Sequence, residues 1–178
     1  MTQLIVITGP IASGKSVVSA ALANRLIAAG QSVAITDLDD IVATFDASTE
    51  EPERIWDNAR EEHSDRVGEL LSSGKDVVIA HGPFYSPDEV SALMRQVPSG
   101  MSVRRVMLLT TYDVALERVA GDSQRGLSKD PLFLRTAYER FLQLLPDIDS
   151  CEWTFNTTET NVDEIVKVIT DALIRERL

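Results

Sequence analysis

Cysteine is almost missing from this chain of 178 residues: Cys151 is the only one, so no disulfide can form within the chain. A chain without disulfides suits a reducing compartment, and we expect the protein to be cytoplasmic. Long hydrophobic runs are missing too, because no stretch approaches the roughly 18 apolar residues that a membrane helix needs. The N-terminus also lacks the pattern of a signal peptide. These absences predict a globular protein without a membrane partner.

Positive charge is scarce. Asp and Glu number 28 and Lys and Arg 17, which gives a net charge of −11. Such a surface repels nucleic acids and anionic membranes, so we expect neither as a partner. An anion can still bind to this protein, but only at a local site built from backbone N–H groups and a few cations.

Repeats, low-complexity tracts and linkers rich in Gly, Pro or Ser are absent, so residues 1–178 are predicted to form one domain. Short apolar segments alternate with amphipathic ones, which is typical of an α/β fold with a parallel sheet. Two segments, at about 40–65 and 121–133, depart from this alternation. We expect strands over 4–8, 32–36, 76–80, 103–110 and 153–156, and helices over 15–29, 52–73, 86–96, 112–120, 130–145 and 161–175.

The segment GPIASGKS, at 9–16, stands between the first strand and the first helix. The spacing GxxxxGK[ST] in this context predicts a phosphate-binding loop, whereas the GxGxxG pattern of dinucleotide-binding folds is absent. Its glycines let the backbone N–H groups point inward, and the positive end of the following helix adds to the attraction for phosphate. Lys15 is expected to reach the β- and γ-phosphates, and Ser16 to offer its hydroxyl to Mg²⁺. The predicted nucleotide contacts here are Gly9, Ala12, Ser13, Gly14, Lys15, Ser16 and Val17.

Two carboxylates follow the second predicted strand, in TDLDDI at 36–41. Ligands of open parallel sheets bind beyond the carboxyl ends of the strands, so Asp37 and Asp39 are expected beside the phosphate loop. An acceptor hydroxyl needs a base or a hydrogen-bond acceptor, and Mg²⁺ needs carboxylate or water-mediated support. Two carboxylates at this spacing can divide these tasks. The alternative is a helix N-cap followed by a solvated acidic turn.

The phosphate loop, the short chain, DLDD after the second strand and a basic segment late in the chain together resemble the small P-loop kinases. This group includes shikimate kinase, gluconate kinase, chloramphenicol phosphotransferase and the nucleoside monophosphate kinases. The resemblance implies a three-layer P-loop fold with a five-stranded parallel sheet in the order 2-3-1-4-5 and a mobile lid. It also implies Asp37 as the base or metal support, and Asp39 as a substrate contact.

The third predicted strand ends in AHGPF, at 80–84, without the acidic residue that many P-loop proteins carry there. His81 takes its place, which disfavours a helicase or motor and shifts metal support onto Asp37. Gly82 would allow a substrate close to the backbone, and the resemblance to shikimate kinase supports such a contact. His81 would hydrogen-bond a polar group of the substrate. The alternative for His81 is a strand-end histidine satisfied by the backbone.

The segment LERVAGDSQRGLSKDP, at 116–131, resembles the lid of small kinases. Arg125 is the expected catalytic arginine, which would close over the nucleotide and spread the charge of the transferring group. Arg118 is expected to contact the adenine face or a phosphate, and Asn156 and Thr157 to border the adenine. The alternatives are a solvated loop charge for Arg125, a favourable helix-end charge for Arg118 and a simple turn at 156–157.

The second substrate is expected over the 40–65 segment. Arg60 resembles the substrate-binding arginine of shikimate kinase, although the surrounding motif differs. The pocket would also be lined by Phe45, Arg54, Trp56 and His63; for Phe45 and Trp56 the alternative is packing in the core. The acidic run at 50–53 favours a neutral or weakly charged acceptor.

These observations predict a phosphotransferase that uses ATP and Mg²⁺ to phosphorylate a hydroxyl of a small molecule. The acceptor class is shikimate-, sugar acid- or antibiotic-like, and the protein would be a monomer or a homodimer. Two alternatives stay open: a nucleoside or nucleotide kinase, and a nucleotide-binding switch with slow ATP hydrolysis.

Overall fold

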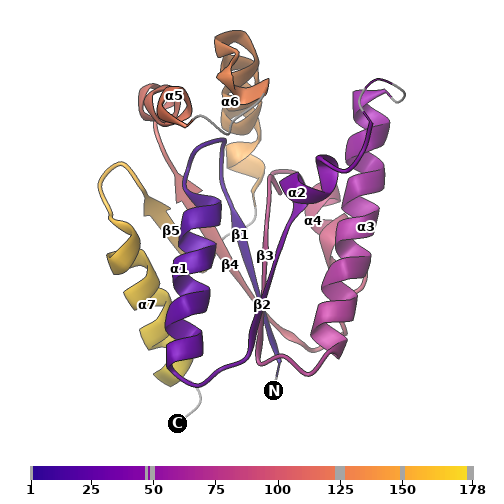
Figure 1. The fold of residues 1–178 in the computed structure, drawn as a ribbon, viewed down its shortest axis with the longest axis vertical. Coiled ribbons are helices and arrows are strands. Elements are labelled where there is room, and N and C mark those ends of the chain that lie inside the picture. Colours follow the sequence, from indigo (N-terminus) through magenta and orange to yellow (C-terminus); the bar gives the residue numbers. More distant parts are fainter. Residues whose placement is uncertain (1, 47, 49–50, 123–126, 149–150, 176–178) are drawn as a thin grey trace.

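The computed structural model describes residues 2–46, 48, 51–122, 127–148 and 151–175, and a five-stranded sheet forms its centre (Figure 1). All neighbouring strands are parallel, and their order is β2-β3-β1-β4-β5. This confirms the predicted fold class and strand order. The strands are β1 (Gln3–Thr8), β2 (Val33–Asp37), β3 (Val77–His81), β4 (Ser102–Leu109) and β5 (Trp153–Asn156).

Helices cover both faces of the sheet. Figure 1 shows α1 and α7 on one face, α2, α3 and α4 on the other, and α5 and α6 beyond the carboxyl ends of the strands. No helix in the described ranges has both the length and the apolar character needed to cross a membrane. The helices are α1 (Lys15–Ala28), α2 (Leu38–Val42), α3 (Pro52–Ser72), α4 (Pro87–Met94), α5 (Tyr112–Gly121), α6 (Pro131–Leu144) and α7 (Val162–Arg175), with 3-10 turns η1 (Leu127–Lys129) and η2 (Leu145–Asp147).

The central strands are buried from both sides, as expected of parallel strands between two helical layers. Residues alternate along β1 between two cores: Ile5 and Ile7 pack toward α1 and α7, whereas Leu4 and Val6 pack toward α3 and α4. All four are at most 3% exposed, so β1 is held rigidly in the middle of the sheet. The loop that follows β1 therefore starts from a fixed position.

The predicted elements agree with the structure to within two residues at each end, with one correction. Residues 38–42 form a helix of their own, α2, whose range was not predicted, although a helix N-cap at Asp37 was the alternative considered for that residue. Asp37 is the N-cap of α2, and its carboxylate accepts a hydrogen bond of 3.0 Å from the Asp39 backbone N–H. The backbone N–H groups in the first turn of a helix have no partner within the helix, and a short polar side chain at the N-cap satisfies one of them. This explains why a helix begins after Asp37.

Candidate active site

The phosphate loop has a backbone that only particular residues allow. Gly9, Ala12 and Gly14 have φ angles of 151°, 60° and 95°. A Cβ at Gly9 would lie 2.1 Å from the Leu108 carbonyl oxygen, so glycine is required there. Ala12 is the one non-glycine residue with positive φ in the described ranges. Strain of this kind is typical of sites with a function.

The N-terminus of α1 opens onto this loop. Its N-cap is Gly14, which provides no side-chain cap for the first backbone N–H groups of the helix. Such uncapped N–H groups, together with the helix dipole, favour an anion. Ser16 and Val17 are exposed on this first turn, whereas Ser13 is buried below it and its backbone N–H donates to Pro10 within the loop.

Lys15 folds back over the loop. Its Nζ donates to the carbonyl oxygens of Gly9 (2.9 Å) and Pro10 (3.2 Å). Tyr85, which the sequence analysis did not single out, donates its hydroxyl to the same Gly9 oxygen at 2.8 Å and is buried. The beginning of the loop is thus held by two donors, and the ammonium group of Lys15 is kept next to the loop backbone.

Asp37 and His81 lie side by side at the carboxyl edge of the sheet. They are paired in the register of β2 and β3, and His81 is paired with Ile7 of β1. Adjacent strands are about 4.8 Å apart, so Asp37 lies within about 10 Å of the strand that carries the phosphate loop. The His81 Nδ1 atom lies 3.3 Å from the Asp37 Oδ1 atom.

Burial sets the protonation of both groups. Burial raises the pKa of Asp37 to about 7, and the negative charge of Asp39 raises it further. The hydrogen bond from the Asp39 backbone N–H and the positive charge of Lys15 lower this pKa. Burial also lowers the pKa of His81 to about 4, with help from Lys15 and His63. The imidazole is therefore uncharged at neutral pH, and its contact with Asp37 is not an ion pair although the distance would fit one. Asp37 titrates in the range where a general base is effective.

His63 lies on α3, near enough to His81 to contribute to the lowered pKa of that residue. His63 is 1% exposed and stacks on Phe84, with the ring centres 5.8 Å apart. Burial lowers the pKa of His63 to about 4, although its hydrogen bond with the Thr36 backbone has the opposite effect. Gly82 is buried among the same groups, where a Cβ would lie 2.9 Å from that of Leu38. Glycine at position 82 is thus explained by the packing of α2; its predicted role as a substrate contact stays a prediction.

The two remaining predicted acceptor contacts differ in their surroundings. Asp39 is exposed on α2. Arg60 on α3 pairs with Asp57 (3.1 Å) and with Glu89 (3.0 Å), and its guanidinium lies 5.6 Å from the centre of the Trp56 ring. Trp56, like Phe45, packs against the core on the α3 side of the sheet.

Arg118 connects the predicted adenine region to the phosphate loop. Its guanidinium donates to the carbonyl oxygen of Ala12 (2.9 Å) and to the hydroxyl (3.0 Å) and carbonyl (2.8 Å) oxygens of Thr157. Asn156 accepts from the Thr158 backbone N–H in a local turn. Arg118 thus joins Thr157 to the loop, and the predicted contacts of both residues with the adenine stay predictions. Arg125 lies outside the described residues.

Residues that could hold Mg²⁺ are present at the loop. In the parts of the chain that the structure describes, no three His, Cys, Asp or Glu side chains form a metal-binding group. Mg²⁺ in nucleotide sites needs no such group, since it binds through one or two protein oxygens, water and substrate phosphates. The exposed hydroxyl of Ser16 and the carboxylate of Asp37 fit this pattern.

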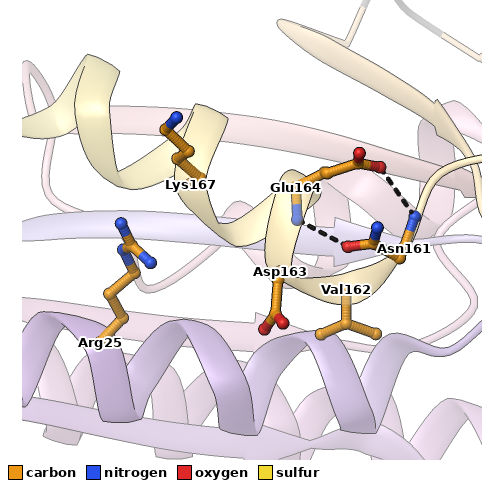
Figure 2. A pocket seen from close by; sticks show the side chains of 6 residues that line it. All are labelled: Arg25, Asn161, Val162, Asp163, Glu164 and Lys167. Atoms are coloured by element: carbon orange, nitrogen blue, oxygen red, sulfur yellow. Dashed lines mark hydrogen bonds between the residues drawn. The ribbon is translucent and has the colours of Figure 1, made fainter.

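A surface pocket between α1 and α7 is separate from this site (Figure 2). Arg25, at one end of it, lies ten residues beyond Lys15 along α1, or about 15 Å. Asn161 and Glu164 are engaged with each other in the cap of α7, through hydrogen bonds of 3.0 and 3.2 Å. None of the predicted site residues lines this pocket, whose lining residues are Arg25, Asn161, Val162, Asp163, Glu164 and Lys167.

Residues 4–146 match a protein-family model described as AAA domain. No curated protein sequence matches the chain significantly. One similar solved structure is the APS kinase of Mycobacterium tuberculosis in complex with AMPPNP and APS, with a TM-score of 0.69, 16% identity and coverage of 97% of both chains.

Another is the shikimate kinase of Bacteroides thetaiotaomicron, with a TM-score of 0.67 and 20% identity over 96% of this chain and 98% of that one. A third is the tunicamycin resistance protein of Deinococcus radiodurans, with a TM-score of 0.64 and 15% identity over 97% and 96%. At these identities the likeness establishes the fold, which confirms the predicted resemblance to small P-loop kinases.

Proposed function

We propose that this chain, which belongs to the AAA domain family and has the fold of small P-loop kinases, transfers the γ-phosphate of ATP to a hydroxyl of a small molecule. The observation that carries this proposal is the position of Asp37 at the strand end beside the phosphate loop, close enough for Lys15 to lower its pKa. A loop that holds a triphosphate and a carboxylate that accepts a proton are the two parts a hydroxyl phosphorylation needs.

In this reaction the acceptor oxygen forms a bond to the γ-phosphorus, the bond from that phosphorus to the β–γ bridging oxygen breaks, and ADP leaves. The proton of the hydroxyl passes to the Asp37 carboxylate. Lys15 and the loop N–H groups stabilise the phosphate charge, and Arg125 would do so from the lid. Mg²⁺, held by Ser16, would supply further charge neutralisation. In the alternative role, Asp37 would support this ion instead of accepting the proton. We propose the whole chain as one domain, with the acceptor over residues 40–65 and the lid at 121–133.

The proposal is tested by ADP release from ATP and Mg²⁺ in the presence of a panel of small hydroxyl compounds: sugars, sugar acids, shikimate, aminoglycosides, phenicols and nucleosides. We expect one class to stimulate turnover, and Asp37→Asn to lower that stimulated rate at least about 100-fold. Asp163→Asn, in the pocket of Figure 2 that none of the predicted site residues lines, is the matched control and should behave as wild type. ADP release that no acceptor stimulates would instead indicate a hydrolytic switch.

A further inference from the structure

Glu89 is a buried carboxylate with four hydrogen-bond donors around it. It lies in the first turn of α4 and is 5% exposed. Its Oε2 atom accepts from the backbone N–H groups of Tyr85 (2.7 Å) and Ser86 (3.0 Å). Its Oε1 atom accepts from the guanidinium groups of Arg60 (3.0 Å) and Arg140 (2.6 Å). The backbone bonds belong to the cap of α4, but the cap does not require the two arginines.

The two arginines come from helices that are far apart in the sequence. Arg60 is on α3 and Arg140 on α6, and both helices reach the carboxyl end of the sheet (Figure 1). Tyr85 links the cluster to the phosphate loop, because its backbone bonds Glu89, its hydroxyl bonds Gly9 and the Arg140 guanidinium lies 5.8 Å from its ring centre. The cluster therefore borders the region where the acceptor is expected.

Two guanidinium groups that converge on one oxygen form a receptor for an anion. Here that position is filled by a carboxylate of the protein itself. Burial alone would raise the pKa of Glu89, but the hydrogen bonds from Arg140, Tyr85 and Ser86 outweigh it and hold the pKa below its ordinary value. Glu89 is therefore ionised at neutral pH. The one surplus positive charge is matched by Asp57, which pairs with Arg60.

We propose that Glu89 determines acceptor specificity by occupying the anion position between Arg60 and Arg140, so that the enzyme accepts hydroxyl compounds that are uncharged at this end and rejects carboxylates and phosphates. The inference rests on the proposed function. It narrows the acceptor to neutral polyols, glycosides or similar alcohols. Glu89 acts through the arginines and is a positioning residue, not a catalytic one.

The test uses inorganic sulfate as the probe and needs no turnover. Sulfate affinity is measured by calorimetry for wild type, for Glu89→Ala, which empties the position between the arginines, and for the double variant Glu89→Ala/Arg140→Gln. We expect Glu89→Ala to bind sulfate at least tenfold more tightly than wild type, and the double variant to lose this gain. Sulfate that binds at the phosphate loop contributes equally to the signal of all three proteins, so it does not affect the comparison. Equal affinity in wild type and Glu89→Ala, or a gain that survives in the double variant, would overturn the proposal.

Arg140→Gln in the wild-type background covers the case in which Glu89→Ala does not fold. Because the Glu89 carboxylate already accepts the hydrogen bond of Arg140, this variant should bind sulfate within twofold of wild type. A tenfold weaker affinity would show an open anion site and refute the inference. Turnover adds a further arm with matched acceptors, such as shikimate and its methyl ester: the neutral member should have a kcat/KM at least tenfold higher. If no compound is phosphorylated, the proposed function fails while the sulfate result still decides the role of Glu89.

Discussion

The Nδ1 atom of His81 lies 3.3 Å from the Oδ1 atom of Asp37, and the two residues are register partners on neighbouring strands. Burial holds the imidazole neutral, so it does not stabilise the negative charge of the carboxylate as a cation would. Asp37 consequently keeps its proton up to about pH 7. Below that pH the proposed base is protonated and cannot accept the proton of the substrate.

Acceptor-dependent kcat/KM is expected to rise with pH to a plateau above about 7, because the deprotonated form of Asp37 is the active one. After burial, the charge of Asp39 is the largest cause that raises this pKa, so Asp39→Asn should move the midpoint of the profile to lower pH. Profiles of both proteins between about pH 5 and 9 check this. Asp163→Asn should leave the midpoint in place; a midpoint that Asp39→Asn does not move would contradict the assignment.

Asp37→Asn should make the protein more stable at alkaline pH. The folded-state pKa is raised from 3.8 to about 7, so the folded state holds the proton more tightly and stability from this group is lost as pH rises through that window. Asparagine has no charge to bury and still caps α2. We expect a gain of about 1–3 kcal/mol at pH 8, and none at pH 3.5. Urea unfolding at the two pH values measures it, and an equal effect at both would point to a cause other than ionisation.

His63→Phe should weaken the acid sensitivity of the fold. The pKa of His63 is lowered from 6.5 to about 4, so its contribution is fully present above pH 6.5 and is lost as pH falls toward 4, where only the unfolded state gains the proton. A phenyl ring can keep the stacking on Phe84. Relative to wild type, the variant should gain about 2–3 kcal/mol between pH 7 and pH 4. Parallel stability curves for the two proteins would refute this.

Gly9→Ala should be far more damaging than Gly30→Ala. A Cβ at position 9 would overlap the Leu108 carbonyl oxygen at 2.1 Å, whereas at position 30 it would meet open space. We expect the free energy of unfolding to fall by at least about 3 kcal/mol for Gly9→Ala and by about 1 kcal/mol for Gly30→Ala. At Gly30 the only cost comes from its φ of 83°, which alanine adopts with strain. Urea unfolding and ATP titration check both. ATP binding by Gly9→Ala as tight as that of Gly30→Ala would argue against the loop as the nucleotide site.

The features that the sequence predicted are those with local signals. The apolar strands, the helix boundaries and the GPIASGKS spacing each lie within one short segment, and the strand order followed from the resemblance that this segment supports. The range of helix α2 was missed because five residues are too few to show a helical period; the only local signal was the helix N-cap considered as the alternative role of Asp37.

The residues around the loop were harder to predict because their partners are far away in sequence. Tyr85 reaches Gly9 across 76 residues, and Glu89 meets Arg60 and Arg140 across 29 and 51. The capping box that Glu89 forms with Ser86 lies within four residues of sequence, and it is a local part of the role of Glu89. Nothing in a single segment shows that the same carboxylate also holds two arginines from α3 and α6.

The Gly9 carbonyl oxygen accepts from both Lys15 and Tyr85. If the loop binds a triphosphate as proposed, the ammonium of Lys15 would turn to the phosphates while the Tyr85 hydroxyl still holds Gly9, so the loop should keep its shape. Most of the conformational entropy of ordering this loop is therefore already lost during folding. The loop is thus preorganised, and we expect nucleotide binding to change its backbone little and to move mainly the side chain of Lys15.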